Sequence, residues 1–95
     1  MIQDLELRAQ VIEILRVVQG LAPGKSVEIR VPPYAAIQCG EGPTHTRGTP
    51  SNVIEMDADT WLALAAGTTT WDTELQAGRI KASGSRADLS SYVPL

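Results

Sequence analysis

The polar residues whose side chains could take part in catalysis or metal binding lie close together in the middle of the chain. Cys39 and His45 are separated by a glycine-rich turn and are the only candidates for a Cys–His nucleophile–base couple. With Glu41 they could also supply three metal ligands, but no second cysteine or histidine provides the usual anchor spacing. We therefore expect a half-buried strand cysteine and a loop histidine that do not act together, and we predict no catalytic residue and no metal site.

The segment around them, GEGPTHTRGTPSN at Gly40–Asn52, is the most plausible polar functional surface of the chain. Its main-chain N–H groups and its threonines could hold an anion. His45 and Arg47 are therefore the candidate head-group residues. The segment contains neither a Walker pattern nor a dinucleotide fingerprint, so a surface loop with ordinary turn chemistry is the alternative.

The carboxylates elsewhere do not form a matched acid–base pair, because each stands where a helix is expected to begin: Asp57, Asp59, Asp72 and Glu74. The remaining candidates are apolar. Large side chains from several segments could enclose a ligand cavity with few polar groups, although plain core packing is the alternative. The residues that would line such a cavity are Trp61, Leu64, Trp71, Leu75, Ile80, Leu15 and Tyr92.

Most of these apolar residues lie in one block, Thr60–Gly84, around which the chain is organised. Glycines and capping residues divide the block, because Gly favours a left-handed helix end and Thr or Asp caps a helix start. We expect a helix that begins at Asp57 or Asp59 and ends at Gly67, a short helix over Trp71–Ala77 capped by Thr70 and ended by Gly78, and an alternating strand over Arg79–Ser83.

The remaining segments must provide the surface against which this block packs. Apolar residues at helical spacing predict a long helix over Asp4–Gln19, closed by Gly20. Alternation predicts three strands, Lys25–Val31, Tyr34–Cys39 and Asn52–Met56, the first two antiparallel across Pro32-Pro33, and a last helical turn after a capping box in Ser85–Leu95. The predicted fold is α+β, with a mostly antiparallel sheet and helices packed on one face.

Size and composition narrow the classes of function. With 95 residues, the chain is expected to form a single domain over 1–95. Its net charge of −3 and scattered basic residues disfavour a nucleic-acid partner. We find no apolar run long enough to span a membrane and no secretory signal pattern, so a cytoplasmic location is expected. A lone cysteine fits a reducing compartment.

The segment Asn52–Ser83 resembles the sterol carrier protein type 2 fold. The motifs that carry the resemblance are VIEMDADTWLALAAG, TTTWDTELQAG and RIKASG. VPPYAAIQC, GPTHTRGTP and GSRADLSSYVPL are similar to a small, mainly actinobacterial branch of that family. The resemblance implies non-covalent binding of sterols, fatty acids or acyl-coenzyme A in a cavity between sheet and helices. There, Trp61, Leu64, Trp71, Leu75 and Ile80 would form the lining.

From the residues and the resemblance together, we predict a non-catalytic protein without a cofactor that binds a small apolar or acyl ligand. The alternative is a protein-interaction module with a solid core that uses the Gly40–Pro50 loop as its working surface. A homodimer is a further expectation, because a small domain with a sheet edge can self-associate.

Overall fold

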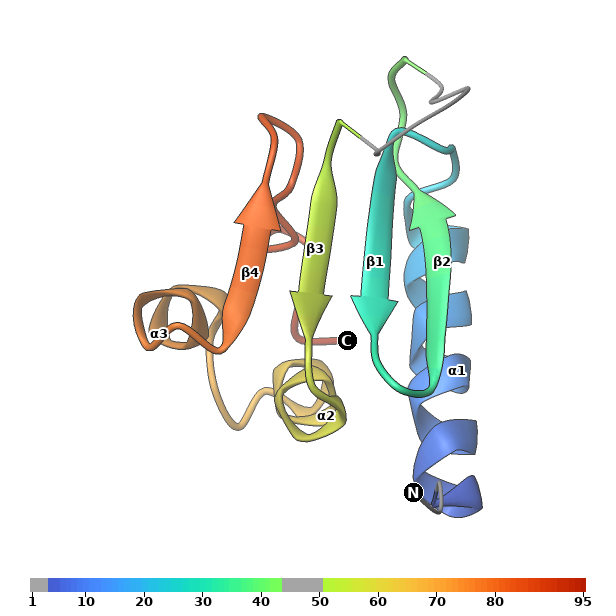
Figure 1. The fold of residues 1–95 in the computed structure, drawn as a ribbon, viewed down its shortest axis with the longest axis vertical. Helices are drawn as coiled ribbons and strands as arrows, with labels where there is room; N and C mark the ends of the chain where they lie inside the picture. Colours follow the sequence, from blue (N-terminus) through green and yellow to red (C-terminus); the bar gives the residue numbers. More distant parts are fainter. Residues whose placement is uncertain (1–3, 44–50) are drawn as a thin grey trace.

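The computed structural model describes residues 4–43 and 51–95 and shows a four-stranded sheet with helices on one side (Figure 1). The elements in chain order are α1 (Leu5–Leu21), β1 (Val27–Val31), β2 (Ala35–Cys39), β3 (Val53–Met56), α2 (Ala58–Ala66), α3 (Trp71–Gln76) and β4 (Ile80–Ser83). The predicted α+β class is therefore confirmed. No helix in the described part of the chain combines the length and apolarity that crossing a membrane requires.

The sheet is mixed, with the strand order β2-β1-β3-β4. The outer pairs β1–β2 and β3–β4 are antiparallel, and the central pair β1–β3 is parallel. Because β2 returns to the end of the sheet at which β1 starts, a β3 that begins at that end and pairs with β1 must run parallel to it. The predicted antiparallel pairing of the first two strands is confirmed, and the parallel central pair refines the expectation of a mostly antiparallel sheet.

Alternation along the strands separates a buried face from a polar face. On β1, Val27, Ile29 and Val31 are buried, while Glu28 and Arg30 point to the opposite face and form an ion pair. The helices lie on the buried side: α1 passes behind β2, and α2 lies at the end of β3 (Figure 1). This arrangement confirms the predicted packing on one face, because each strand buries one apolar row.

Local capping chemistry sets the helix ends close to the predicted positions. Asp57 caps α2 by accepting a hydrogen bond of 2.8 Å from the Thr60 N–H, and Gly67 ends that helix with a left-handed φ of 79°. Thr70 caps α3 through a bond of 3.1 Å from the Thr73 N–H. These caps satisfy N–H and C=O groups that a helix end leaves without intrahelical partners.

The predictions for the end of the first helix and for the tail after Gly84 are both wrong. Gly20 does not close the first helix. Instead α1 continues to Leu21, where the Ala22 N–H still reaches the Val18 carbonyl at 2.8 Å. A glycine inside a helix costs only about 1 kcal/mol, and burial of Val18 and Ala22 offsets that cost.

The tail after Gly84 forms turns rather than the expected helical turn with a capping box. The Asp88 carboxylate accepts from the Ser90 N–H at 2.8 Å instead of capping a helix start. Ala87 and Leu89 are buried in the core, and the tail runs behind the sheet on the same side as α1 (Figure 1). Tertiary burial of these two side chains therefore decides the path of the tail.

Candidate functional site

The structure divides the seven predicted ligand-binding residues into a buried group and an exposed pair. The buried group belongs to a hydrophobic core cluster and consists of Leu15, Trp61, Leu64, Trp71 and Ile80. The Trp61 indole N–H donates to the Val11 carbonyl at 3.3 Å, which ties α2 to α1. Leu75 and Tyr92 lie at the surface, 39% and 37% exposed. In the described part of the chain, none of the five hollows considered is lined by Trp61 or Trp71.

Tyr92 borders a hollow of about 430 Å³, which we call the tail hollow. It lies where the end of α1, the start of β1, the end of β2 and the tail meet. Its apolar lining comprises Leu21, Ala22, Pro23, Val27, Cys39, Leu89 and Tyr92. Small-molecule sites in proteins usually have volumes of about 300–1,000 Å³, so the tail hollow has the size of a ligand site.

Four elements hold this lining in place. Val27 and Cys39 face each other across the β1–β2 pair, on the side of the sheet that the helices cover. Leu21 comes from the last turn of α1 and is 56% exposed. Leu89, 3% exposed, anchors the tail against the core. The apolar part of the lining thus combines the buried side chains of Val27, Cys39 and Leu89 with the exposed side chains of Leu21 and Tyr92.

The polar lining of the tail hollow comprises Ser26, Gly40, Glu41, Arg86, Asp88 and Ser91. The buried Ser26 hydroxyl lies 3.0 Å from the Gly40 carbonyl and 2.9 Å from the Glu41 carbonyl, to which it donates. Arg86 donates from Nη1 to the Glu41 carbonyl at 3.0 Å. Its guanidinium group lies so close to Gly42 that a Cβ there would be 2.8 Å from Cζ. These contacts join the tail to the end of β2.

Asn52 connects the two sides of this polar wall. Its amide nitrogen donates to the Ser26 carbonyl at 2.9 Å, and its amide oxygen accepts from the Arg86 N–H at 3.0 Å. The side chain is buried, so these two bonds replace the hydrogen bonds to water that the amide loses on folding. Asn52 therefore holds the tail at a set distance from the start of β1.

Two titratable groups on the hollow have shifted pKa values. Hydrogen bonds from Ser90, first from its N–H and then from its side chain, lower the pKa of Asp88, so this carboxylate is charged at neutral pH. Burial raises the pKa of the Cys39 thiol, which favours the neutral, poorly nucleophilic form. The lining is therefore suited to binding rather than to nucleophilic chemistry.

The predicted head-group site lies mostly outside the part of the chain that the structure describes. His45 and Arg47, with most of the Gly40–Pro50 loop, lie outside the described residues. Within residues 4–43 and 51–95, no group of three His, Cys, Asp or Glu side chains is arranged to hold a metal ion.

Several residues that line or support the tail hollow were not predicted from the sequence. Leu21 fell just after the predicted end of the first helix, and Arg86 and Leu89 fell in a tail without a predicted functional role. Asn52, which does not line the hollow but bonds to Ser26 and Arg86 in its wall, was predicted only as the start of a strand. One signal was present: Asn52 is the only asparagine in the chain, and it precedes the alternating run of β3. Nothing in the local sequence pairs it with Arg86.

A second hollow, of about 450 Å³, lies between α1 and α2 and is lined by residues that include Ile14, Val17, Leu62 and Leu95. The Leu95 N–H donates to the Ala65 carbonyl at 3.0 Å, so the end of the tail lies against this groove. The groove is more open than the tail hollow and has fewer polar groups. It offers less enclosure and less orientation to a ligand.

Comparison with known proteins places this arrangement in a family. A search of curated proteins finds no match to the chain. A family model described as a bacterial SCP ortholog matches residues 4–95. That match spans α1, the whole sheet and the tail, and it agrees with the resemblance carried by Asn52–Ser83. The chain therefore belongs to the bacterial SCP ortholog family, whose members are sterol-carrier-protein-like domains.

Proposed function

We propose that this protein is a non-catalytic binding protein that takes up an apolar or acyl ligand in the tail hollow. The observation that carries the proposal is a hollow of about 430 Å³, lined by both apolar and polar residues, in a chain of the bacterial SCP ortholog family. The ligand chain would lie against Val27, Leu89 and Tyr92, and its polar end would face Arg86 and Ser26. The neutral Cys39 thiol acts as an apolar lining group.

The buried residues predicted to line a cavity have a supporting role in this proposal. Trp61, Leu64 and Trp71 belong to the buried core cluster, in which α2 and α3 pack against the rest of the domain. Direct contact between these side chains and a ligand stays a prediction. A homodimer also stays a prediction.

Titration with decanol, an uncharged alkyl probe, tests the proposal. A ligand that binds only the native state raises the free energy of unfolding by about 2.7 kcal/mol at a ligand concentration 100 times Kd, so the melting temperature should rise with decanol concentration. Calorimetric titration should give a matching Kd. No heat of binding and no rise in melting temperature would refute the proposal.

A matched pair of variants locates the site. Tyr92→Ala should weaken decanol binding about tenfold or more, the factor that about 1.4 kcal/mol gives. Leu75→Ala removes an equally exposed apolar side chain on α3 and should leave Kd unchanged. Trp61→Phe should lower the melting temperature, because it removes the indole N–H bond to α1, while Kd stays close to that of the wild type. Weakening by Leu75→Ala or Trp61→Phe, but not by Tyr92→Ala, would place the ligand elsewhere.

A further inference from the structure

One side of α1 carries exposed apolar side chains. The side with Leu15 and Val18 is buried, and the main contacts of the helix within the described residues are with β2 and α2. Figure 1 shows α1 at the β2 edge of the sheet, so its outer side faces away from the strands. Leu5, Val17 and Leu21 on this helix are 75%, 46% and 56% exposed. Apolar side chains grouped on an uncovered helix are typical of a surface that a partner covers.

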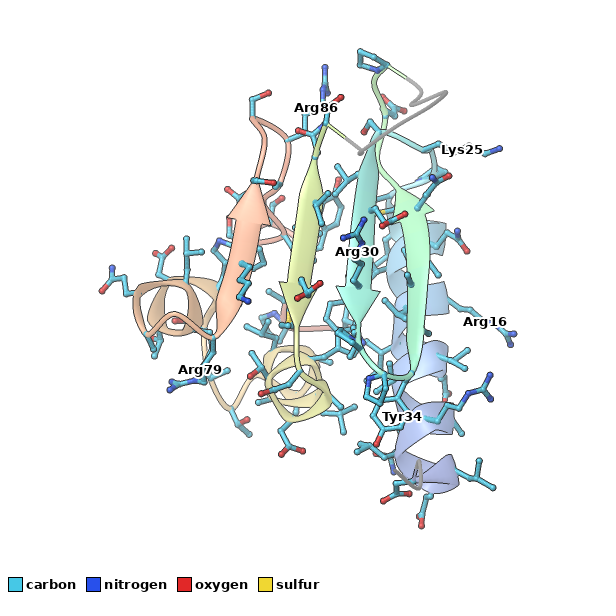
Figure 2. All side chains as sticks on the ribbon, viewed as in Figure 1. Arg16, Lys25, Arg30, Tyr34, Arg79 and Arg86 are labelled. Carbon is cyan, nitrogen blue, oxygen red and sulfur yellow. The ribbon has the colours of Figure 1, made fainter. Side chains whose placement is uncertain are left out.

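A shallow hollow runs along this outer side. The residues that line it all belong to α1: Arg8, Ala9, Ile12, Glu13, Arg16 and Val17. Figure 2 shows the Arg16 side chain pointing away from the molecule. The groove between α1 and α2 adjoins the hollow, because both are lined by Glu13 and Val17. The outer side of α1 therefore offers apolar side chains, a recess and charges of both signs.

Gly20 lies in the last turn of the same helix and is exposed. It is not among the glycines with a positive φ, and a Cβ built on it would meet no described atom within 4 Å. The described part of the domain therefore does not require glycine here, although alanine would favour the helix more. Glycine also serves where another backbone approaches closely. This position is suited to close packing of a second helix.

The charges on α1 complement those of an antiparallel copy of the same helix. When Glu13 is set level with Arg16 of a second copy, the twofold symmetry of a homodimer sets Arg16 level with the second copy's Glu13. A parallel pair in register would instead set each of these charges beside one of its own sign, which is unfavourable. The charge pattern therefore favours a second copy of this chain in the antiparallel orientation.

The same antiparallel register matches the uncharged residues. It sets Ile12, in the shallow hollow, level with the second copy's exposed Val17, which can fill the recess. It also sets Ala9 level with the second copy's Gly20, so that the two helices can approach closely. From these matches we infer that the outer side of α1 is the interface of an antiparallel homodimer.

The dimer goes beyond the proposed function and does not depend on a ligand in the tail hollow. With 17 residues, α1 is about 25 Å long. One face of such a helix buries less than the roughly 800 Å² per partner of a standard interface, so we expect a weak dimer with a Kd of about 10–300 µM. Salt should weaken it further, because the paired charges lie at the surface.

Sedimentation equilibrium of the full chain at low salt tests the inference. Between about 10 µM and about 1 mM, concentrations on either side of the expected Kd, the mean mass should rise from 10.2 kDa towards twice that value. A mass that stayed at 10.2 kDa over the whole range would overturn the inference and leave this surface to a different partner.

Charge reversal tests the antiparallel pairing. Glu13→Arg and Arg16→Glu should each weaken self-association about tenfold or more, since each places like charges across the interface. An equal mixture of the two variants should associate at least as tightly as the wild type, because one copy is then positive at both positions and the other negative. Lys81→Glu, an exposed position on β4 at the opposite edge of the sheet, is the matched control and should leave Kd unchanged.

The variants can contradict the inference in two ways. A dimer that neither reversal on α1 weakened would have its interface elsewhere, which would overturn the inference. A mixture that stayed as monomeric as the separate variants would refute the pairing of Glu13 with Arg16 across the interface.

Discussion

Replacing Asn52 by Ala should remove a large share of the free energy of unfolding. The change leaves the Ser26 carbonyl and the Arg86 N–H without the partners that Asn52 supplies at 2.9 and 3.0 Å. Leaving a buried polar group unsatisfied costs about 1–3 kcal/mol, and losing a bond to a partly exposed group costs about 0.5–1.5 kcal/mol. Together these effects predict a loss of about 1.5–4.5 kcal/mol, a substantial part of the roughly 5–15 kcal/mol typical of a domain.

Urea unfolding followed by tryptophan emission measures this loss, because Trp61 and Trp71 are both buried and become hydrated on unfolding. The slope of free energy against urea concentration should stay unchanged, since the variant exposes the same surface on unfolding. Each kcal/mol should lower the melting temperature by about 4–8 °C in a domain of this size. Gln76→Ala, which removes an exposed amide on α3, is the matched control and should change the stability by less than about 0.5 kcal/mol.

Asn52→Asp separates the two hydrogen bonds. The aspartate keeps an oxygen for the Arg86 N–H but has no donor for the Ser26 carbonyl, and it places a charge in a buried site. Its loss at neutral pH should be at least as large as that of Asn52→Ala. If Asn52→Ala lost no more stability than Gln76→Ala, the claim that this amide holds the tail to the sheet would be refuted.

Two further predictions concern the ion pair after α3 and the turn after β4. The hydrogen bond from Arg79 holds the pKa of Glu74 below its usual value. The charged Glu74 therefore stabilises the folded state at neutral pH. This stabilisation is lost as pH falls below about 4.3, the usual value in the unfolded chain, and through the lower pKa of the folded state. Glu74→Gln should therefore show a flatter dependence of unfolding free energy on pH in acid than the wild type, and parallel curves would count against this ion pair. Gly84→Ala places a Cβ 2.3 Å from the Asn52 amide oxygen at a φ of +100°, and should cost about 3 kcal/mol or more in urea unfolding. Gly78→Ala, at a φ of +78° with nothing within 4 Å, should cost only about 1–2 kcal/mol, and equal losses would show that the close approach at Gly84 is unimportant.

Local patterns predicted most of the secondary structure because they act over a few residues. Asp57 and Thr70 were identified as caps from their positions before apolar runs, and each accepts a bond from the N–H three residues on. Gly67 was identified as a helix end and has the left-handed φ that favours glycine. Gly20 was misjudged because a glycine signal in the sequence does not reveal the burial of Val18 and Ala22 beside it.

The candidate site was harder to predict because its parts are far apart in the chain. Apolar spacing identified Trp61 and Trp71 correctly as large side chains that need burial, but it could not show whether the space beside them is filled. Tyr92 was the one predicted ligand residue that lines the tail hollow. The rest of that lining comes from chain segments that meet only after the sheet has formed.

The amino-acid sequence by itself determined the α+β class, the antiparallel pairing of the first two strands and the family, since periodicity, caps and motifs are properties of neighbouring residues. Tertiary structure alone decided the parallel contact between β1 and β3, the turns of the tail and the position of the hollow. The physical reason is visible at Asn52 and Arg86, which are 34 residues apart and exchange a hydrogen bond. No local preference encodes such a bond, because it forms only where packing brings both groups out of water together.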